Sequence, residues 1–145
     1  MFAVLSPGES LTAVMSGAAA TTNPVATTEW QDVAPAADLS GKTIHAQVML
    51  DKVDGGTPSF PRGYVELFIQ SSGYKYASGP AKGLTAGVWT DLTLNVSTPD
   101  FGVTGYDPTQ IIQVGIQFGV GGMPDGGVFG AETFPKFHVD SIVAQ

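Results

Sequence analysis

The sequence predicts an all-β protein, an antiparallel two-sheet β-sandwich of jelly-roll type. Two segments, residues 63–70 (GYVELFIQ) and 110–119 (QIIQVGIQFG), alternate apolar with polar or small residues, which is typical of strands with one buried face. The 19 Gly and 10 Pro residues favour short strands joined by turns. No segment repeats apolar residues at helical spacing over three turns, so we expect negligible helix.

Strand candidates follow one another along the whole chain, separated by turn residues and Gly-rich loops. The expected strands are residues 2–5, 10–16, 29–33, 43–50, 64–70, 74–77, 88–96, 110–119 and 136–143. Alternation predicts that the inward side chains of three of these strands are Ile44, Ala46, Val48 and Leu50; Val65, Leu67 and Ile69; and Ile112, Val114, Ile116 and Phe118. Residues 17–28, 51–63 and 120–130 are expected to be loops, the first of them with an edge strand as the alternative.

Composition limits the classes of partner. The net charge of −7, with only six scattered Lys and Arg, argues against a nucleic acid or a basic membrane-surface role. No run approaches the roughly 18 apolar residues of a spanning helix. The absence of cysteine excludes disulfides and Cys-ligated zinc. The length of 145 residues is that of one domain, so we expect a single domain over residues 1–145, and we expect a monomer.

The outward faces of the predicted strands suit a ligand rich in hydroxyl groups. Sugar rings stack on aromatic side chains, and planar amides donate to and accept from neighbouring hydroxyls. The predicted platforms are Tyr64, Phe68, Tyr74 and Tyr76, and the predicted polar contacts are Gln47, Glu66, Gln70, Gln113 and Gln117. For any one of them an ordinary solvated face is the better explanation, whereas Gln70 and Gln117 together favour a binding site.

Four blocks of the sequence resemble carbohydrate-binding modules with a galactose-binding-like jelly roll, which are found beside bacterial polysaccharide hydrolases. The blocks are DLSGKTIHAQVML (38–50), AGVWTDLTLNV (86–96), DPTQIIQVGIQF (107–118) and FHVDSIVA (137–144). The resemblance covers about residues 38–145. It implies non-catalytic binding of a β-linked plant-cell-wall glycan (β-glucan, xylan or mannan), a catalytic domain in the same parent enzyme, and secretion. Because Pro7, Gly8 and Glu9 interrupt the first apolar run, we expect a mature module rather than a signal peptide.

A structural calcium is a further expectation. Asp140 interrupts an apolar strand, where a carboxylate is costly to bury unless it is paired or bound to a metal. The resemblance implies a structural calcium at this strand. The partner acid that family members supply from their first strand is missing here, and Glu9 is the candidate to replace it. The alternative is an Asp140 carboxylate that accepts backbone hydrogen bonds. His45 and His138 lack a metal-site spacing and are expected to face solvent.

Three functions remain open at this stage. The chain matches a binding module better than an enzyme, because nothing in the sequence brings a second acid opposite Glu66. A hydrolase or lyase that uses Glu66 is one alternative. The other is a structural or adhesive surface β-domain, virion-like or of chimeric origin, because residues 6–33 resemble small β-segments of phage surface proteins. Trp89 is expected at the sandwich edge, while Trp30 fits the core and the surface equally well.

Overall fold

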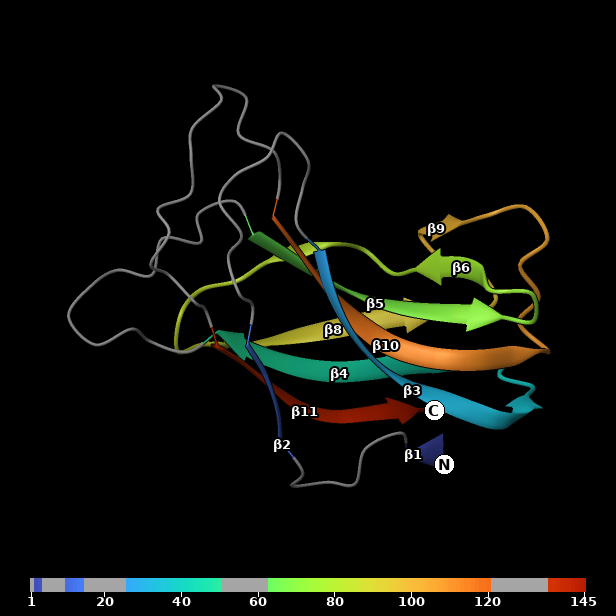
Figure 1. Ribbon diagram of the computed structural model, residues 1–145, viewed down its shortest axis with the longest axis horizontal. Coiled ribbons are helices and arrows are strands. Elements are labelled where there is room, and N and C mark those ends of the chain that lie inside the picture. The colour runs from blue at the N-terminus through green and yellow to red at the C-terminus, as the bar shows by residue number, and fades with distance from the viewer. Residues whose placement is uncertain (1, 4–9, 15–25, 51–62, 121–135) are drawn as a thin grey trace.

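The computed structural model describes residues 2–3, 10–14, 26–50, 63–120 and 136–145. This part of the chain forms two antiparallel sheets that pack face to face (Figure 1), so the predicted β-sandwich is confirmed. Among the same residues, no helix is long and apolar enough to cross a membrane. The predicted loops at 17–28, 51–63 and 120–130 lie largely outside the described residues, and the residues of them that are described, 26–28, 63 and 120, lie in strands.

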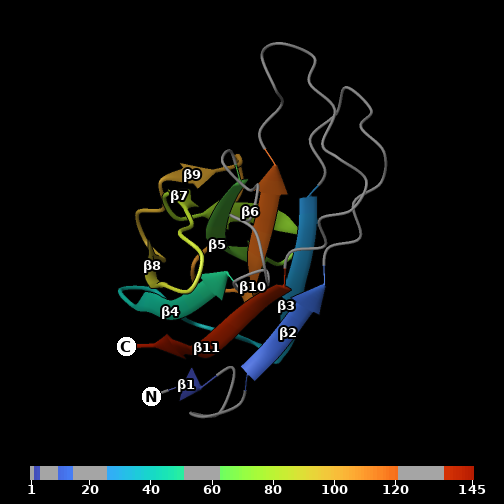
Figure 2. The same ribbon diagram turned by 90° about the vertical axis from the view of Figure 1, so that its left-hand side faces the viewer.

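The first sheet contains the two ends of the chain. Its strands are β1 (Phe2–Ala3), β2 (Ser10–Val14), β4 (Thr43–Leu50), β8 (Trp89–Asn95) and β11 (Lys136–Ala144). The order is β1-β11-β4-β8, and β2 also pairs with β11. The first two strands therefore both pair with the last one, and the N- and C-termini lie on the same side of the molecule (Figure 2).

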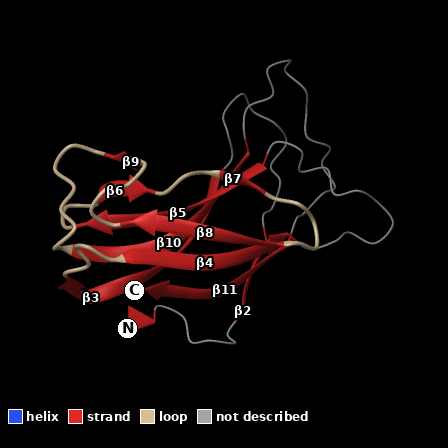
Figure 3. Cartoon of the chain, turned by 180° about the vertical axis from the view of Figure 1, so that it is seen from behind, coloured by secondary structure: helices blue, strands red, loops and turns tan. Residues whose placement is uncertain are grey.

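The second sheet carries the segments that alternate most clearly in the sequence. Its strands are β3 (Ala26–Ala37), β5 (Gly63–Ser71), β6 (Lys75–Ser78), β7 (Lys82–Gly83), β9 (Phe101–Gly102) and β10 (Ile111–Val120). The order is β3-β10-β5-β6-β9, and β7 pairs with β5. Figure 1 looks onto this sheet, and Figure 3 looks onto the first one. The strand predicted at 29–33 is longer than expected, because it spans Ala26–Ala37.

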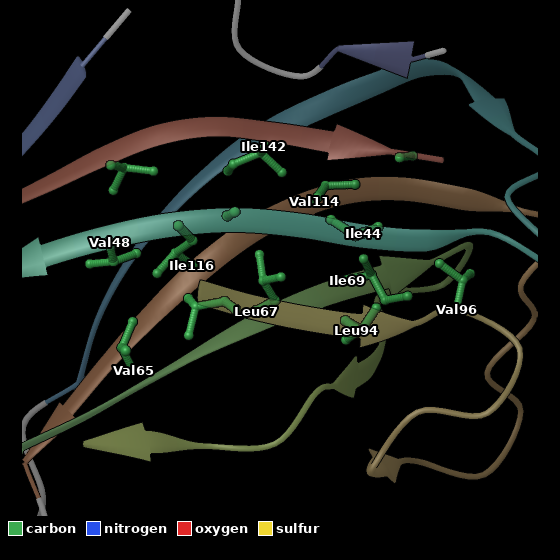
Figure 4. Close-up of a cluster of buried hydrophobic side chains, with 14 of the residues drawn as sticks. Ile44, Val48, Val65, Leu67, Ile69, Leu94, Val96, Val114, Ile116 and Ile142 are labelled. Carbon is green, nitrogen blue, oxygen red and sulfur yellow. The ribbon is translucent and has the colours of Figure 1, made fainter. Parts of the chain in front are cut away.

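The core lies between the sheets and includes most of the side chains that alternation assigned to the inside (Figure 4). The inward residues predicted on β4 and β5 are all buried. Phe118 of β10 meets Phe137 of β11 with ring centroids 4.1 Å apart, which joins the two sheets through an aromatic contact. Burial of these apolar surfaces from water is the main force that holds the sandwich together.

One inward assignment on β10 is wrong. Ile111 is fully buried in the core, whereas Ile112 is only half-buried. The pairing of β10 with both neighbours shifts register between Ile111 and Gln113. Such a bulge places two residues of one strand opposite one residue of its partner, and the alternation changes phase there.

The turn between β5 and β6 corrects a second assignment. Gly73 and Tyr74 both have positive φ, at 75° and 56°, and Tyr74 therefore lies in the turn and not in the following strand. Its side chain is 70% exposed. Tyr74, predicted as a sugar platform, is for this reason displaced from the strand positions that build the sheet face.

Candidate functional site

The outer face of the β3-β10-β5-β6-β9 sheet, here called the Trp30 face, is built from side chains that alternate with the core residues. Cross-strand pairing places them in three adjacent rows. The rows are Asp32, Gln113, Gln70 and Tyr76; Trp30, Gly115, Phe68, Ser78 and Phe101; and Gln117 with Glu66. Paired residues of antiparallel strands project on the same side, so each row forms a continuous strip across the sheet.

Gln113 and Asp32 form a hydrogen-bonded pair at one border of the Trp30 face. The Gln113 amide nitrogen Nε2 donates to Asp32 Oδ1 at 2.7 Å across β10 and β3. The bond fixes the orientation of the amide, because its nitrogen must point toward the carboxylate. A glutamine amide has a second N–H and a carbonyl oxygen, and a carboxylate has four acceptor positions. The pair thus retains the capacity to bind hydroxyl groups.

The polar cluster at the other border consists of Glu66, Gln117 and the hydroxyl of Tyr76. Tyr76 belongs to the row of Gln70, but its side chain extends across the middle row to Glu66 and Gln117. The Tyr76 hydroxyl donates to Glu66 Oε1 at 2.9 Å, and it lies 3.3 Å from Gln117 Oε1. Burial raises the pKa of Tyr76 well above its ordinary value, and the nearby Glu66 carboxylate raises it further, so the hydroxyl remains a proton donor. Its single proton cannot fully serve both acceptors. The longer contact, to Gln117, is the one that a ligand hydroxyl would replace most easily.

Aromatic rings fill the row between these polar groups. Phe68 is only 4% exposed although it lies outside the main core, because Tyr76 stacks on it at 5.6 Å with an interplanar angle of 14°. Phe101 continues the group at 6.2 Å from Tyr76 and is 55% exposed. On the edge strand β3, Trp30 is also 55% exposed. Two accessible rings therefore stand at opposite ends of the middle row.

Gly115 lies between Trp30 and Phe68 in that row, paired with Trp30 on β3 and with Phe68 on β5. Glycine inside a strand weakens the strand and often marks a position that another group approaches closely. Gly115 is buried, so its neighbours cover it. The missing side chain leaves room for the rings on both sides to lie over the β10 backbone.

The structure brings most of the predicted binding residues together. Gln70 and Gln117 lie on the same face, Gln113 pairs with Gln70, and Gln117 contacts Tyr76. Tyr64 is half-buried and shares the outward side of β5 with Glu66. The role of these residues in binding stays a prediction.

Gln47 is a correction, because it belongs to the other sheet. It projects outward from β4, and its Nε2 donates to Asp91 Oδ1 of β8 at 2.7 Å. The sequence pattern predicts the sugar face for Gln47, because its strand alternates in the same way as β5 and β10. Alternation distinguishes inside from outside, but it carries no information about which sheet a strand joins.

Three residues of the Trp30 face were missed by the sequence interpretation: Trp30, Asp32 and Phe101. Trp30 and Asp32 are spaced two residues apart, which in a strand places both side chains on one face. This spacing was the available signal, but the neighbouring residues Glu29 and Gln31 are also polar, so alternation did not distinguish the inside of this strand from its outside. Phe101 lies in the two-residue strand β9, which gives no periodic signal at all.

The described residues hold no group of three or more His, Cys, Asp or Glu side chains that could bind a metal ion. Asp140 is half-buried and projects to the outer side of β11, where its Cα is paired with that of Gln47. Glu9, its predicted partner, lies outside the described residues, so calcium at Asp140 stays a prediction. Both histidines were expected to face solvent. His45 is exposed, as expected, whereas His138 is only half-exposed.

The chain was compared with known proteins. Neither a scan against protein-family models nor a search of curated proteins gives a match for it.

Proposed function

We propose that the Trp30 face binds a neutral polysaccharide without cleaving it, most simply a β-linked glycan such as a β-glucan, xylan or mannan. The observation that carries the proposal is the row Trp30–Gly115–Phe68, which lies between two hydrogen-bonded groups of amides and carboxylates. An exposed indole ring provides an apolar surface for the C–H side of a sugar ring. The flanking amides and carboxylates match its hydroxyl groups.

The charge of the face supports a neutral ligand. Both charged side chains in the three rows, Asp32 and Glu66, are acidic, and the chain as a whole carries a net charge of −7. A polyuronate would bring its own carboxylates close to these two groups, and like charges repel. Neutral hydroxyls face no such cost.

The separation of the two carboxylates supports binding over hydrolysis. Asp32 and Glu66 are two strand spacings apart across the sheet and four residues apart along it. At about 4.8 Å per strand and about 3.3 Å per residue, their Cα atoms are roughly 16 Å apart. Glycosidases hold their two carboxyl groups about 5–9.5 Å apart. Each carboxylate is also held by its own partner, Gln113 or Tyr76, which opposes a movement toward the other.

The resemblance of the sequence to carbohydrate-binding modules is consistent with this proposal. The resemblance extends the proposal in two ways. The module would be secreted and would work beside a catalytic domain of the same enzyme, and a calcium ion at Asp140 would stabilise the fold without contacting sugar. The competing function is a structural or adhesive surface domain that binds no glycan.

Affinity electrophoresis in gels that contain soluble β-glucan, xylan or galactomannan tests the proposal. We expect at least one polysaccharide to retard the protein, with no release of reducing sugar. Trp30→Ala should weaken binding at least tenfold, which corresponds to about 1.4 kcal/mol. The matched control is Tyr74→Asn, which removes another exposed ring from a turn where asparagine tolerates positive φ.

Retardation that is equal in Trp30→Ala and in the control would place binding elsewhere. No retardation by any polysaccharide would favour the surface-domain function, and released reducing sugar would favour an enzyme.

A further inference from the structure

The opposite outer face of the sandwich repeats the arrangement that defines the Trp30 face. In the five-stranded sheet, Trp89 and Asp91 project outward from β8, while Leu92 and Leu94 face the core. Gln47 of β4 donates from Nε2 to Asp91 Oδ1 at 2.7 Å. These outward residues, together with Met49, are here called the Trp89 face.

The two arrangements agree in sequence, in register and in hydrogen bonding. Each contains a Trp-x-Asp segment, WQD at 30–32 and WTD at 89–91. In both, the Asp is paired across the strands with a Gln that donates to it at 2.7 Å. In both, the Trp is paired with the residue two positions after that Gln, which is Gly115 in one case and Met49 in the other.

The position of the two strands in their sheets is also the same. β3 and β8 are each the last strand in the order of their sheet, and each pairs with an inner strand on one side. Both indole rings are accessible, with Trp30 55% and Trp89 44% exposed. Trp is enriched at interfaces because its ring is apolar while its N–H can form a hydrogen bond, so an exposed indole beside a fixed amide is suited to ligand contact.

We propose that the Trp89 face is a second binding site for the same class of ligand, a hydroxyl-rich polysaccharide. This proposal rests on the proposed function of the Trp30 face. Trp89 forms the stacking platform, and the Gln47–Asp91 pair binds hydroxyls of the sugar that lies on it.

The two sites face away from each other, because they lie on the outer sides of two packed sheets (Figure 2). One sugar unit cannot contact both. The protein therefore binds either two polysaccharide chains or two distant segments of one chain. Two linked sites raise the apparent affinity for a long polymer by avidity, without raising the affinity of either site for a short oligosaccharide.

The test uses Trp30→Ala, Trp89→Ala and the double variant, with Tyr74→Asn as the control, and a polysaccharide that retards the wild-type protein. Oligosaccharides released from that polysaccharide serve as the calorimetric probe. We expect two oligosaccharides per protein in the wild type, one in each single variant and none in the double variant. Thermal melting checks that each variant is folded, and both exposed rings are suited to replacement because they hold little core packing.

A second readout depends only on the number of sites. A protein with two opposed sites cross-links soluble polysaccharide chains, so the wild type should make the solution turbid or raise its viscosity, and each single variant should not. Affinity for the polymer should fall at least tenfold in each single variant through the loss of avidity.

The outcomes separate the two proposals. One oligosaccharide per wild-type protein, with binding unaffected by Trp89→Ala, would overturn the second site and leave the function of the Trp30 face intact. One oligosaccharide lost only with Trp89→Ala would overturn the function of the Trp30 face. A wild-type protein that binds no glycan would overturn both.

Discussion

The Trp30 face and the Trp89 face share one arrangement of three residues but differ in what surrounds it. On the Trp30 face the Trp lies opposite Gly115, Phe68 follows in the same row, and Tyr76 of the neighbouring row stacks on Phe68. On the Trp89 face the Trp lies opposite Met49, whose long side chain occupies the position next to the ring. In the two proposed sites the Trp–Asp–Gln group would set the position of the sugar, and its neighbours would decide how much additional surface the sugar contacts. We therefore expect the Trp30 face to bind more tightly.

The edges beside the two Trp residues also differ. Lys82 donates from Nζ to the backbone carbonyl of Asp91 at 2.6 Å, which occupies one acceptor on β8 and places a cation next to the Trp89 face. On β3 the chain instead contains Pro35. A charged side chain and a proline are both common means of preventing an edge strand from pairing with another chain. Lys82 and Pro35 thus both oppose pairing of an edge strand with another chain. Of the two, only Lys82 adds a charge near a proposed site.

The largest expected effect is a loss of stability from a change in the core that both faces share. Ile116→Ala on β10 deletes a fully buried side chain and should lower the free energy of unfolding by about 2–5 kcal/mol. Gln117→Ala, at the next residue, removes an outward side chain and should change it by less than about 0.5 kcal/mol, while it weakens glycan binding at the Trp30 face. Denaturant titration measures both changes.

A loss of stability for Gln117→Ala equal to that for Ile116→Ala would mean that the amide has a structural role. Ile112→Ala is the intermediate control, because the bulge leaves Ile112 only half-buried, and its effect should fall between the two.

A smaller change should separate the two faces. Gly115→Val adds a side chain between Trp30 and Phe68 and should force the more exposed ring, Trp30, away from the β10 backbone. We expect at least tenfold weaker oligosaccharide binding at the Trp30 face and unchanged binding at the Trp89 face, as measured by calorimetry. Because valine favours strands and the new side chain points away from the core, the melting temperature should change little. Tighter binding in this variant would contradict the role given to the glycine.

The smallest expected effect is a dependence on alkaline pH that involves Tyr76. Its pKa is raised in the folded protein, so the folded state retains a proton that the unfolded state loses above about pH 10. The contribution of Tyr76 to stability is thus present below the unfolded pKa and is lost as the pH rises toward the folded pKa. Denaturant midpoints measured from about pH 8 to about pH 11 should fall, and Tyr76→Phe should reduce the slope.

Tyr106 provides the control for this prediction. Burial raises its pKa as well, but its hydroxyl donates to the Val96 carbonyl at 2.8 Å, away from the Trp30 face. Tyr106→Phe should reduce the slope too, without an effect on glycan binding. If glycan binding at the Trp30 face weakens equally in both variants, the Tyr76 hydroxyl has no special part in the site.

The sequence by itself determined the class of fold and the inside and outside of most strands. Val65, Leu67 and Ile69 are buried as their alternation predicts, because a side-chain period of two leaves one face of each strand to the core. Two turns in the structure are also local in origin, because the carboxylates of Asp38 and Asp107 each accept hydrogen bonds from the residue two positions later, Ser40 and Thr109.

Only the tertiary structure decided which outward faces coincide. Gln47 and Gln113 have the same pattern in the sequence, yet they lie on opposite sides of the sandwich, because strand order depends on contacts between distant segments. Ile112 is not in the core, where it was predicted to be, because a bulge changes the phase of β10. The alternation of one strand does not reveal its register with neighbouring strands, so the sequence could not show this bulge. The pairing of Trp30 with Gly115 and of Trp89 with Met49, which defines the two proposed sites, came from register alone.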